Sequence, residues 1–387
     1  MLSNPAAIDP SPQTVRLEHD LLGDLAVPAD AYYGVQTARA LDNFRITDIP
    51  LAHFPNFIRA LAMVKKAAAR ANRQLGQLPA PLEEAIAAAC DEVIAGRWHE
   101  HFVVDMIQGG AGTSTNMNAN EVIANRALEL LGFAKGEYDQ LHPNNHVNLS
   151  QSTNDVYPTA VRLGILLSYG ELTNAMEALT AALRAKGAEF ANVIKMGRTQ
   201  LQDAVPMTLG QEFLGFATTV SEDVERIREL VRLFREVNLG ATAIGTGINT
   251  DPDYAKLVVE ELSAISGEKM VLAADLVEAT SDTGAFVTFS GVLKRCAVKI
   301  SKVCNDLRLL SSGPRTGFGE INLPPMQPGS SIMPGKVNPV IPEVVNQVAY
   351  QVIGNDLTVT FAAEAGQLQL NAFEPVITFN ILQSMRI

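Results

Sequence analysis

The segment over residues 329–339 combines groups that could transfer protons and hold a carboxylate. It contains the hydroxyls of Ser330 and Ser331, followed by the ammonium of Lys336 and the amide of Asn338. Glycines and prolines lie between them, so the backbone has both unusual freedom and fixed φ angles, as is typical of a loop. An ordinary solvated connection would have a similar composition. The functional interpretation is that a serine handles protons while the other groups bind an anion.

Three further segments are crowded with hydroxyls and amides. They cover residues 112–118, 150–155 and 195–206. The first two come at the start of predicted helices, where a single such side chain would suffice as a cap. The third could be a solvated join between two helices. Because the positive end of a helix can also bind a carboxylate, the four segments together predict a site for a small dianion.

Long helices must hold these polar segments in place. No proline occurs between Pro158 and Pro206, between Pro206 and Pro252, or between Pro252 and Pro314, which permits long uninterrupted helices. Apolar residues spaced three and four apart predict helices within these gaps. The predicted helices cover residues 159–190, 209–237 and 275–310. Shorter patterns in the N-terminal part cover residues 58–75, 82–95 and 118–131.

These patterns predict a mainly all-α fold. We expect a smaller N-terminal helical domain over residues 1–144 and a central long-helix bundle over residues 145–387. The bundle has an unusual final part, because no lysine or arginine occurs from Val337 to Met385. A helix with so little charge is expected to be covered on nearly all sides, and its buried amides need hydrogen-bond partners.

One helix from Pro339 to Asn371 would extend about 50 Å at about 1.5 Å per residue. A single chain offers few helices to enclose it, so we expect several subunits to complete the bundle. One large monomeric bundle is the alternative.

The composition of the 387 residues excludes several classes of protein. With 47% apolar residues the chain can form a large core,. A net charge of −12 argues against nucleic acid and anionic membranes as partners,. No run approaches the roughly 20 apolar residues of a transmembrane helix, and residues 1–14 lack the apolar core of a signal peptide. Three scattered cysteines indicate a reduced, cytoplasmic protein,. The six histidines show no metal-ligand spacing,, so we predict no metal and no cofactor.

Six strings resemble the fumarase/aspartase superfamily, in that family's order. They are residues 30–37, the polar strings around Thr113, Ser152 and Thr199, residues 245–250 and the loop at 329–339. The resemblance extends over nearly the whole chain from about Arg16. Members of this family cleave C–N or C–O bonds to release fumarate.

Four details resemble the aspartase branch more than the fumarases. They are Val35, residues 109–114, residues 238–244, and Gln200, which stands where fumarases carry a histidine. The resemblance therefore implies reversible anti-elimination of ammonia from L-aspartate, through an aci-carboxylate, to give fumarate. The alternatives are a class II type fumarate hydratase, a lyase for a substituted aspartate, or a non-catalytic helical scaffold.

The resemblance also implies a role for each site residue. Ser330 would be the general base that removes a proton from C3 of the substrate. Four hydroxyls would donate to the β-carboxylate, namely those of Thr113, Ser152, Thr153 and Ser331. Lys336, Asn338 and Thr199 would hold the α-carboxylate, while Asn154, with Gln200 beside it, would contact the amino group.

The resemblance further implies a homotetramer whose active sites are shared between subunits. Family members normally continue beyond Ile387 into a small C-terminal domain, which this chain would lack.

Overall fold

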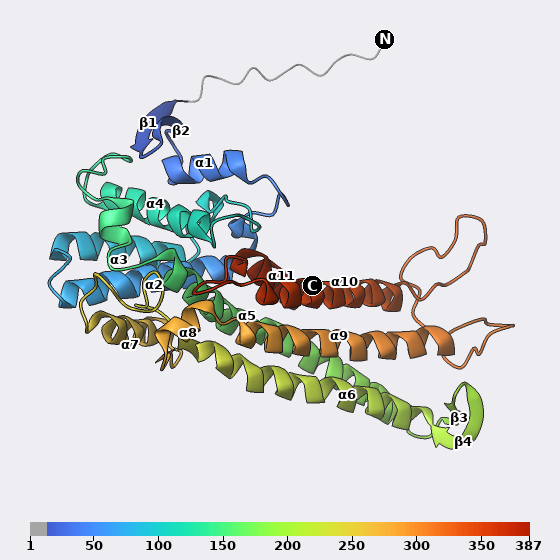
Figure 1. Ribbon diagram of the computed structural model, residues 1–387. Helices are drawn as coiled ribbons and strands as arrows, with labels where there is room; N and C mark the ends of the chain where they lie inside the picture. The colour runs from blue at the N-terminus through green and yellow to red at the C-terminus, as the bar shows by residue number, and fades with distance from the viewer. Residues whose placement is uncertain (1–13) are drawn as a thin grey trace, which may run out of the picture. The chain divides into compact units, whose positions relative to one another are not determined.

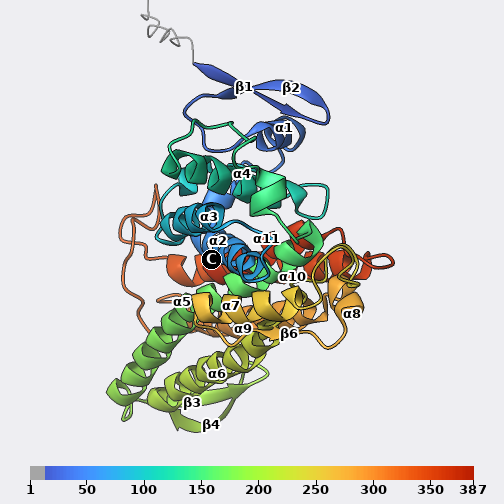
Figure 2. The same ribbon diagram turned by 90° about the vertical axis from the view of Figure 1, so that its left-hand side faces the viewer.

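The computed structural model describes residues 14–387, so the segment 1–14 examined for a signal peptide lies outside them except for Thr14. The chain divides into two units (Figures 1 and 2). Unit 1 contains the residues up to 164 together with 235–281 and 367–375. Unit 2 contains residues 165–234, 282–366 and 376–387. Most of the described chain is helical, which confirms the predicted mainly all-α fold. The domain boundary at residues 144 and 145 remains a prediction.

Unit 1 is built around the helix α2 (Pro55–Gln74). It packs against α3 (Ala80–Ile94), α4 (Thr113–Leu130) and α7 (Tyr254–Ser266). Alanines cover much of the buried surface of α2, and such small side chains let neighbouring helices approach closely. The rest of unit 1 consists of short elements. They are the hairpin β1 (Val15–Asp20) and β2 (Gly23–Pro28), the helices α1 (Val35–Asn43) and α8 (Leu276–Ser281), the π-helical turn η3 (Pro143–Val147), and the parallel pair β5 (Glu236–Val237) and β6 (Val271–Leu272).

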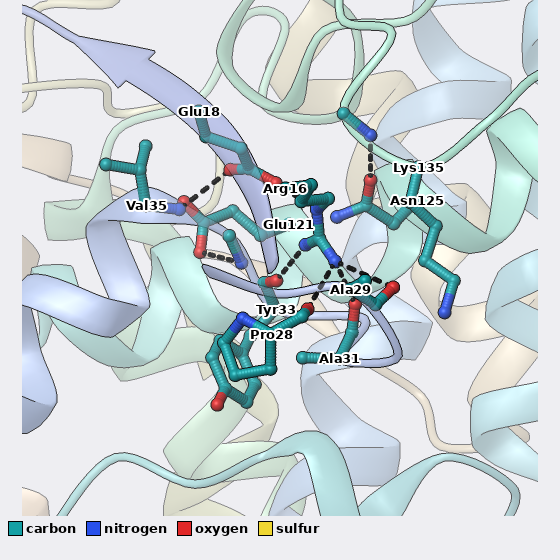
Figure 3. Close-up of polar contacts among 12 residues, drawn as sticks. Arg16, Glu18, Pro28, Ala29, Ala31, Tyr33, Val35, Glu121, Asn125 and Lys135 are labelled. Atoms are coloured by element: carbon teal, nitrogen blue, oxygen red, sulfur yellow. Dashed lines mark hydrogen bonds and ion pairs between the residues drawn. The ribbon is translucent and has the colours of Figure 1, made fainter. Parts of the chain in front are cut away.

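The string at residues 30–37 takes part in a buried hydrogen-bond network at the start of α1 (Figure 3). Glu121 accepts hydrogen bonds from the backbone N–H groups of Gly34, Gln36 and Thr37, and Glu18 accepts one from Val35. These are the N–H groups that the first turn of a helix leaves without partners. A Cβ at Gly34 would lie 2.5 Å from Glu18 Oε2, so any larger residue there would displace this carboxylate. This string therefore has a structural role in fixing α1.

Unit 2 consists of long helices and one hairpin. In Figure 1, α9 (Gly284–Leu310) runs between α6 (Leu209–Leu230) and α10 (Val340–Glu364), and it packs against both. The helix α5 (Thr153–Glu189) leads into the antiparallel hairpin β3 (Ile194–Thr199) and β4 (Gln202–Thr208). Thr208 then begins α6 with a reciprocal capping box to Gln211. The C-terminal helix is α11 (Glu374–Arg386).

Three predicted helices end earlier or break in the structure. The helix predicted to reach Asn371 ends at Glu364, because Gly366 and the left-handed Leu368 follow and residues 367–370 form an isolated bridge. The segment at 209–237 leaves α-helical geometry after Leu230 for a 3₁₀ turn. The segment at 275–310 is interrupted between α8 and α9. In each case the apolar spacing continues past the break, and spacing alone does not mark it.

The amides of α10 divide into two groups. Asn346 is buried, donates to Ser301 and accepts from Arg308, while Asn355 is buried and donates to Ser384. Gln347 and Gln351 are exposed. The expectation of partners for the buried amides is therefore met inside this chain, while one face of the helix remains open.

Candidate active site

Thr113 begins α4 in unit 1. It follows Gly112, whose φ is 93°, and its hydroxyl donates to the carbonyl of Gly110 at 2.7 Å. A Cβ at Gly112 would lie 2.3 Å from the ring of Tyr157 on α5. Glycine is therefore required at position 112 for two reasons: the backbone is left-handed, and α4 and α5 approach each other closely here. The sequence string places Thr113 at a helix start, as predicted, and this glycine sets the position of that start.

The predicted residues Ser152, Thr153 and Asn154 form the first turn of α5 and the residue before it. Ser152 Oγ accepts the N–H of Asn154 at 3.2 Å, and Thr153 Oγ1 accepts a hydrogen bond from Asn116 Nδ2 of α4 at 3.1 Å. Thus the strings around Thr113 and Ser152, far apart in the sequence, meet in unit 1.

A third string joins the same place in unit 1. Asn154 Nδ2 donates to the carbonyl of Ala243 at 2.8 Å, and Asn238 Nδ2 donates to the carbonyl of Asn154 at 3.0 Å. The string at residues 238–244, which resembles the aspartase branch, therefore holds the amide of Asn154 in position.

Asp155 is a buried anchor for this region. Its carboxylate accepts the backbone N–H groups of Ser152 at 3.1 Å, Gly240 at 3.1 Å and Thr242 at 2.9 Å. Burial raises the pKa of Asp155 to about 7, against the lowering effect of these hydrogen bonds and of Lys65. Asp155 lies within the predicted polar segment at residues 150–155. Nothing in the sequence indicated that its side chain would bind the distant backbone of Gly240 and Thr242.

Lys65 lies beneath the same turn and is fully buried on α2. Its Nζ donates to three side-chain amide oxygens, those of Asn116 at 2.6 Å, Asn148 at 2.8 Å and Gln151 at 2.9 Å. Burial lowers the pKa of Lys65 to about 7, opposed by the nearby charge of Asp155. The sequence analysis missed Lys65, although a lysine among the alanines and larger apolar residues of a helix face was a signal.

Thr199 and Gln200 lie at the turn of the β3–β4 hairpin in unit 2. The turn residues Gln200 and Leu201 have φ angles of 55° and 63°, which matches the turn geometry that a tight antiparallel hairpin favours. Both turn residues are exposed. The predicted join between helices is therefore a hairpin rather than a simple loop.

Ion pairs connect this hairpin to the segment between α9 and α10. Glu320 pairs with Arg198 at 2.5 Å and with Lys195 at 3.2 Å, and Lys195 also pairs with Glu212 at 2.6 Å. Burial alone would raise the pKa of Glu320, but the hydrogen bonds from Arg198 and Lys195 outweigh it and hold that pKa below its usual value. The two predicted site segments of unit 2 are thereby tethered to each other.

Ser330 lies in the segment between α9 and α10, where its hydroxyl oxygen faces two donors. Ser330 Oγ accepts the backbone N–H of Ile332 at 3.2 Å and of Met333 at 3.0 Å. Two aligned N–H dipoles stabilise negative charge on this oxygen, which lowers the cost of ionising it. A serine hydroxyl in this setting is the candidate group for proton transfer in this loop.

The same loop surrounds a hollow of about 460 Å³. Ser330 and Lys336 line it, and Ser331 is an exposed neighbour. Asn338 Nδ2 donates to the carbonyl of Gly329 at 2.5 Å, and a Cβ at Gly329 would overlap the carbonyl of Lys336. Glycine is thus required for the loop to fold back on itself.

The predicted site residues are divided between the two units, and within unit 2 the hairpin turn and the serine loop line separate hollows. Unit 1 holds Thr113, Ser152, Thr153 and Asn154, and unit 2 holds Thr199, Gln200, Ser330, Ser331, Lys336 and Asn338. Within residues 14–387, no group of three or more His, Cys, Asp or Glu side chains is arranged to hold a metal ion. In the same residues no helix is long and apolar enough to cross a membrane.

The fold consists mainly of long packed helices, with hydroxyl and amide groups at helix starts and a serine on a connecting loop. A family described as lyase matches residues 23–354, and the chain belongs to it, as a member of the fumarase/aspartase superfamily.

Relatives match almost the whole chain. An aspartate ammonia-lyase of Pseudomonas aeruginosa is 69% identical over 373 residues, which are 96% of this chain and 79% of that protein. An aspartate ammonia-lyase of Escherichia coli K12 is 58% identical over 374 residues, 96% of this chain and 78% of that protein.

Two solved structures are similar as well. A cobalt-bound fumarate lyase/delta crystallin of Brucella melitensis has a TM-score of 0.95 and 66% identity, covering 96% of this chain and 81% of that one. A class II fumarase of Schistosoma mansoni has a TM-score of 0.91 and 38% identity, with the same coverage of both chains.

Proposed function

We propose that this protein is an aspartate ammonia-lyase, which converts L-aspartate reversibly to fumarate and ammonia. Relatives that carry this name match 96% of the chain at 58% to 69% identity. The structural observation that carries the proposal is the Ser330 hydroxyl oxygen, which accepts two backbone N–H groups on a loop. A serine in this setting can act as a base.

The reaction begins with proton removal by Ser330. The ionised Oγ takes a proton from C3 of aspartate, and the electron pair left on C3 delocalises into the β-carboxylate as an aci-carboxylate. The hydroxyls of Thr113, Ser152, Thr153 and Ser331 donate to its two oxygens, where negative charge grows most.

The second step breaks the C2–N bond. The electrons on C3 form the new double bond, and the protonated amino group (–NH3⁺) leaves from the opposite face with the bonding pair as neutral ammonia. Lys336, Asn338 and Thr199 hold the α-carboxylate, while Asn154 and Gln200 contact the amino group. No cofactor or metal takes part in this proposal.

A class II type fumarate hydratase is the second candidate, since the Schistosoma mansoni fumarase has a similar structure. Gln200 favours the ammonia-lyase, because an amide cannot handle the proton of a leaving water as a histidine could. A lyase for a substituted aspartate is a third candidate.

A spectroscopic assay at the absorbance of fumarate tests these alternatives. We expect fumarate to form from L-aspartate, with equimolar ammonia, and not from L-malate or N-substituted aspartates. Fumarate from malate alone would replace the proposal with the hydratase.

We also propose that the enzyme is a homotetramer with active sites shared between subunits. The support is the open face of α10, where large apolar side chains are half or more exposed in the single chain, as Tyr350 is at 58%, Leu357 at 57% and Phe361 at 65%. An apolar stripe of this kind marks a protein interface.

We further propose a cytoplasmic location, which the three free cysteines support. The proposed domains are residues 1–144 and residues 145–387.

A further inference from the structure

Lys65 is a buried cation with a fixed direction of hydrogen bonding. An ammonium has three donors and no acceptor, and Lys65 places one donor on each of three amide oxygens. The oxygen of the Asn116 amide must therefore face Lys65. This removes the usual ambiguity over which end of the amide carries the NH₂ group.

The other end of the Asn116 amide is then determined. Its Nδ2 donates to Thr153 Oγ1 at 3.1 Å and to Asn148 Oδ1 at 3.2 Å. Because an NH₂ group cannot accept, the Thr153 hydroxyl must be the acceptor in this contact. Its own proton is left to be donated elsewhere.

The surrounding groups preserve this direction. Asn148 Oδ1 accepts from Lys65, Asn116 and Asn120, so it offers no competing donor to Asn116. Gln151 turns its own Nε2 to the carbonyl oxygens of Val147 and Leu149. Asp155 supplies the nearby negative charge, and its oxygens are occupied by three backbone N–H groups.

We propose that Lys65 is a positioning residue which, through Asn116, fixes Thr153 as a hydrogen-bond donor to the substrate carboxylate. The chain of bonds runs from Lys65 Nζ–H to Asn116 Oδ1, and from Asn116 Nδ2–H to Thr153 Oγ1. This inference rests on the proposed function, in which Thr153 donates to the aci-carboxylate. A donor whose direction is set before the reaction stabilises developing charge without reorganisation.

Asn116→Asp is the sharpest test, because it reverses the polarity of the relay while keeping its shape. The new carboxylate pairs with Lys65 but cannot donate to Thr153, whose proton turns toward it instead. We expect kcat for fumarate formation to fall 10-fold or more, while the far-ultraviolet circular dichroism stays that of the folded wild type. If Asn116 only supports the structure, the variant keeps normal kcat.

A double-mutant cycle of Lys65→Met and Thr153→Val tests whether the lysine acts through the threonine. If it does, the double variant loses little more kcat than Thr153→Val alone, because the two changes remove one contribution. If the kcat loss of the double variant equals the product of the two single losses, the two residues act independently and the proposal is overturned. If Lys65→Met does not fold, Asn116→Asp and Thr153→Val still decide the question.

Lys66→Met is the matched control. Lys66 is the next residue and pairs with the exposed carboxylate of Asp91 instead of with Asn116, so its loss should leave kcat and KM near wild-type values. If wild type turns over malate instead of aspartate, the cycle is run on malate. If it turns over neither, the proposed function fails by itself. The hydrogen-bond chain from Lys65 through Asn116 to Thr153 is then tested by the rise in melting temperature that fumarate causes. This rise should be smaller in both Asn116→Asp and Thr153→Val than in the wild type. An undiminished rise in Asn116→Asp would overturn the proposal.

Discussion

Individual side chains in this protein obtain their chemistry from a few polar neighbours. Ser330 has a hydroxyl that is a weak base in water, but two backbone N–H groups face its oxygen. Lys65 and Asp155 are both buried. Burial lowers the pKa of Lys65 to about 7 and raises the pKa of Asp155 to about 7. Sequence reasoning proposed Ser330 from its string, and that role stays a prediction. It missed the roles of Lys65 and Asp155, since their partners come from loops and helices distant along the chain.

Replacing Ser330 by alanine removes the proposed base. We expect kcat for fumarate formation to fall by about three orders of magnitude or more, as is usual for a lost nucleophile or base, while the far-ultraviolet circular dichroism stays unchanged. Ser221→Ala is the control, because Ser221 Oγ is an exposed hydroxyl that bonds only its own helix. Turnover near the wild-type rate in Ser330→Ala would remove Ser330 from the mechanism.

Glu374 makes stability depend on pH. Burial raises its pKa from the model-compound value of 4.5 to about 8, with Arg162 opposing the shift. Since the folded state holds this proton more tightly than the unfolded state, the stabilisation is complete below pH 4.5 and is lost as pH rises through 8. Glu374→Gln should therefore reduce the fall in melting temperature between pH 5 and pH 9. An unchanged pH profile in the variant would contradict this assignment.

At the scale of elements, helix starts and short connections bring the polar groups into place. The apolar spacing predicted α2, α3, α5 and most of α9 within a few residues. It did not reveal the hairpin β3–β4 or the end of α10 at Glu364, because turn residues with positive φ angles decide both. The junction of α4 with α5 depends in the same way on one glycine.

Gly112→Ala should destabilise unit 1 strongly. The alanine would have to adopt a left-handed backbone conformation, and its Cβ would press against the Tyr157 ring. Backbone strain and overpacking each cost about 1–3 kcal/mol. Gly132→Ala is the matched control, because Gly132 has a φ of 87° but open space around its Cβ position. Denaturant unfolding should give a clearly larger loss for Gly112→Ala. Equal losses would show that contact with Tyr157 is unimportant.

At the scale of the whole molecule, the open face of α10 exposes several large apolar side chains. Within the described residues, α9 covers the opposite side of α10, while Ile341, Leu357 and Phe361 remain at least half exposed. Burying such side chains stabilises by about 25 cal/mol per Å², which favours association of several copies of the chain. The same stripe was visible in the sequence as a run without lysine or arginine.

Phe361→Glu should shift the protein toward smaller assemblies. A charge within an apolar interface costs several kcal/mol unless it is paired, so light scattering coupled to size exclusion should show dimers or monomers in place of the proposed tetramer. Lys302→Glu on α9 is a surface control with the same sign of charge change and should leave the assembly unchanged. A Phe361→Glu variant of wild-type size would contradict an interface at this position.

The sequence by itself determined the helical class, the family resemblance and the four polar segments, because these depend on local spacing and on strings of adjacent residues. Only the tertiary structure decided which of those groups touch. It placed Asn116 against Thr153, residues 238–243 against Asn154, and Glu320 against Arg198. It also placed Lys65 under the first of these contacts. The physical reason is that a hydrogen bond needs donor and acceptor within about 3 Å in a fixed direction, and distance along the chain carries no such information.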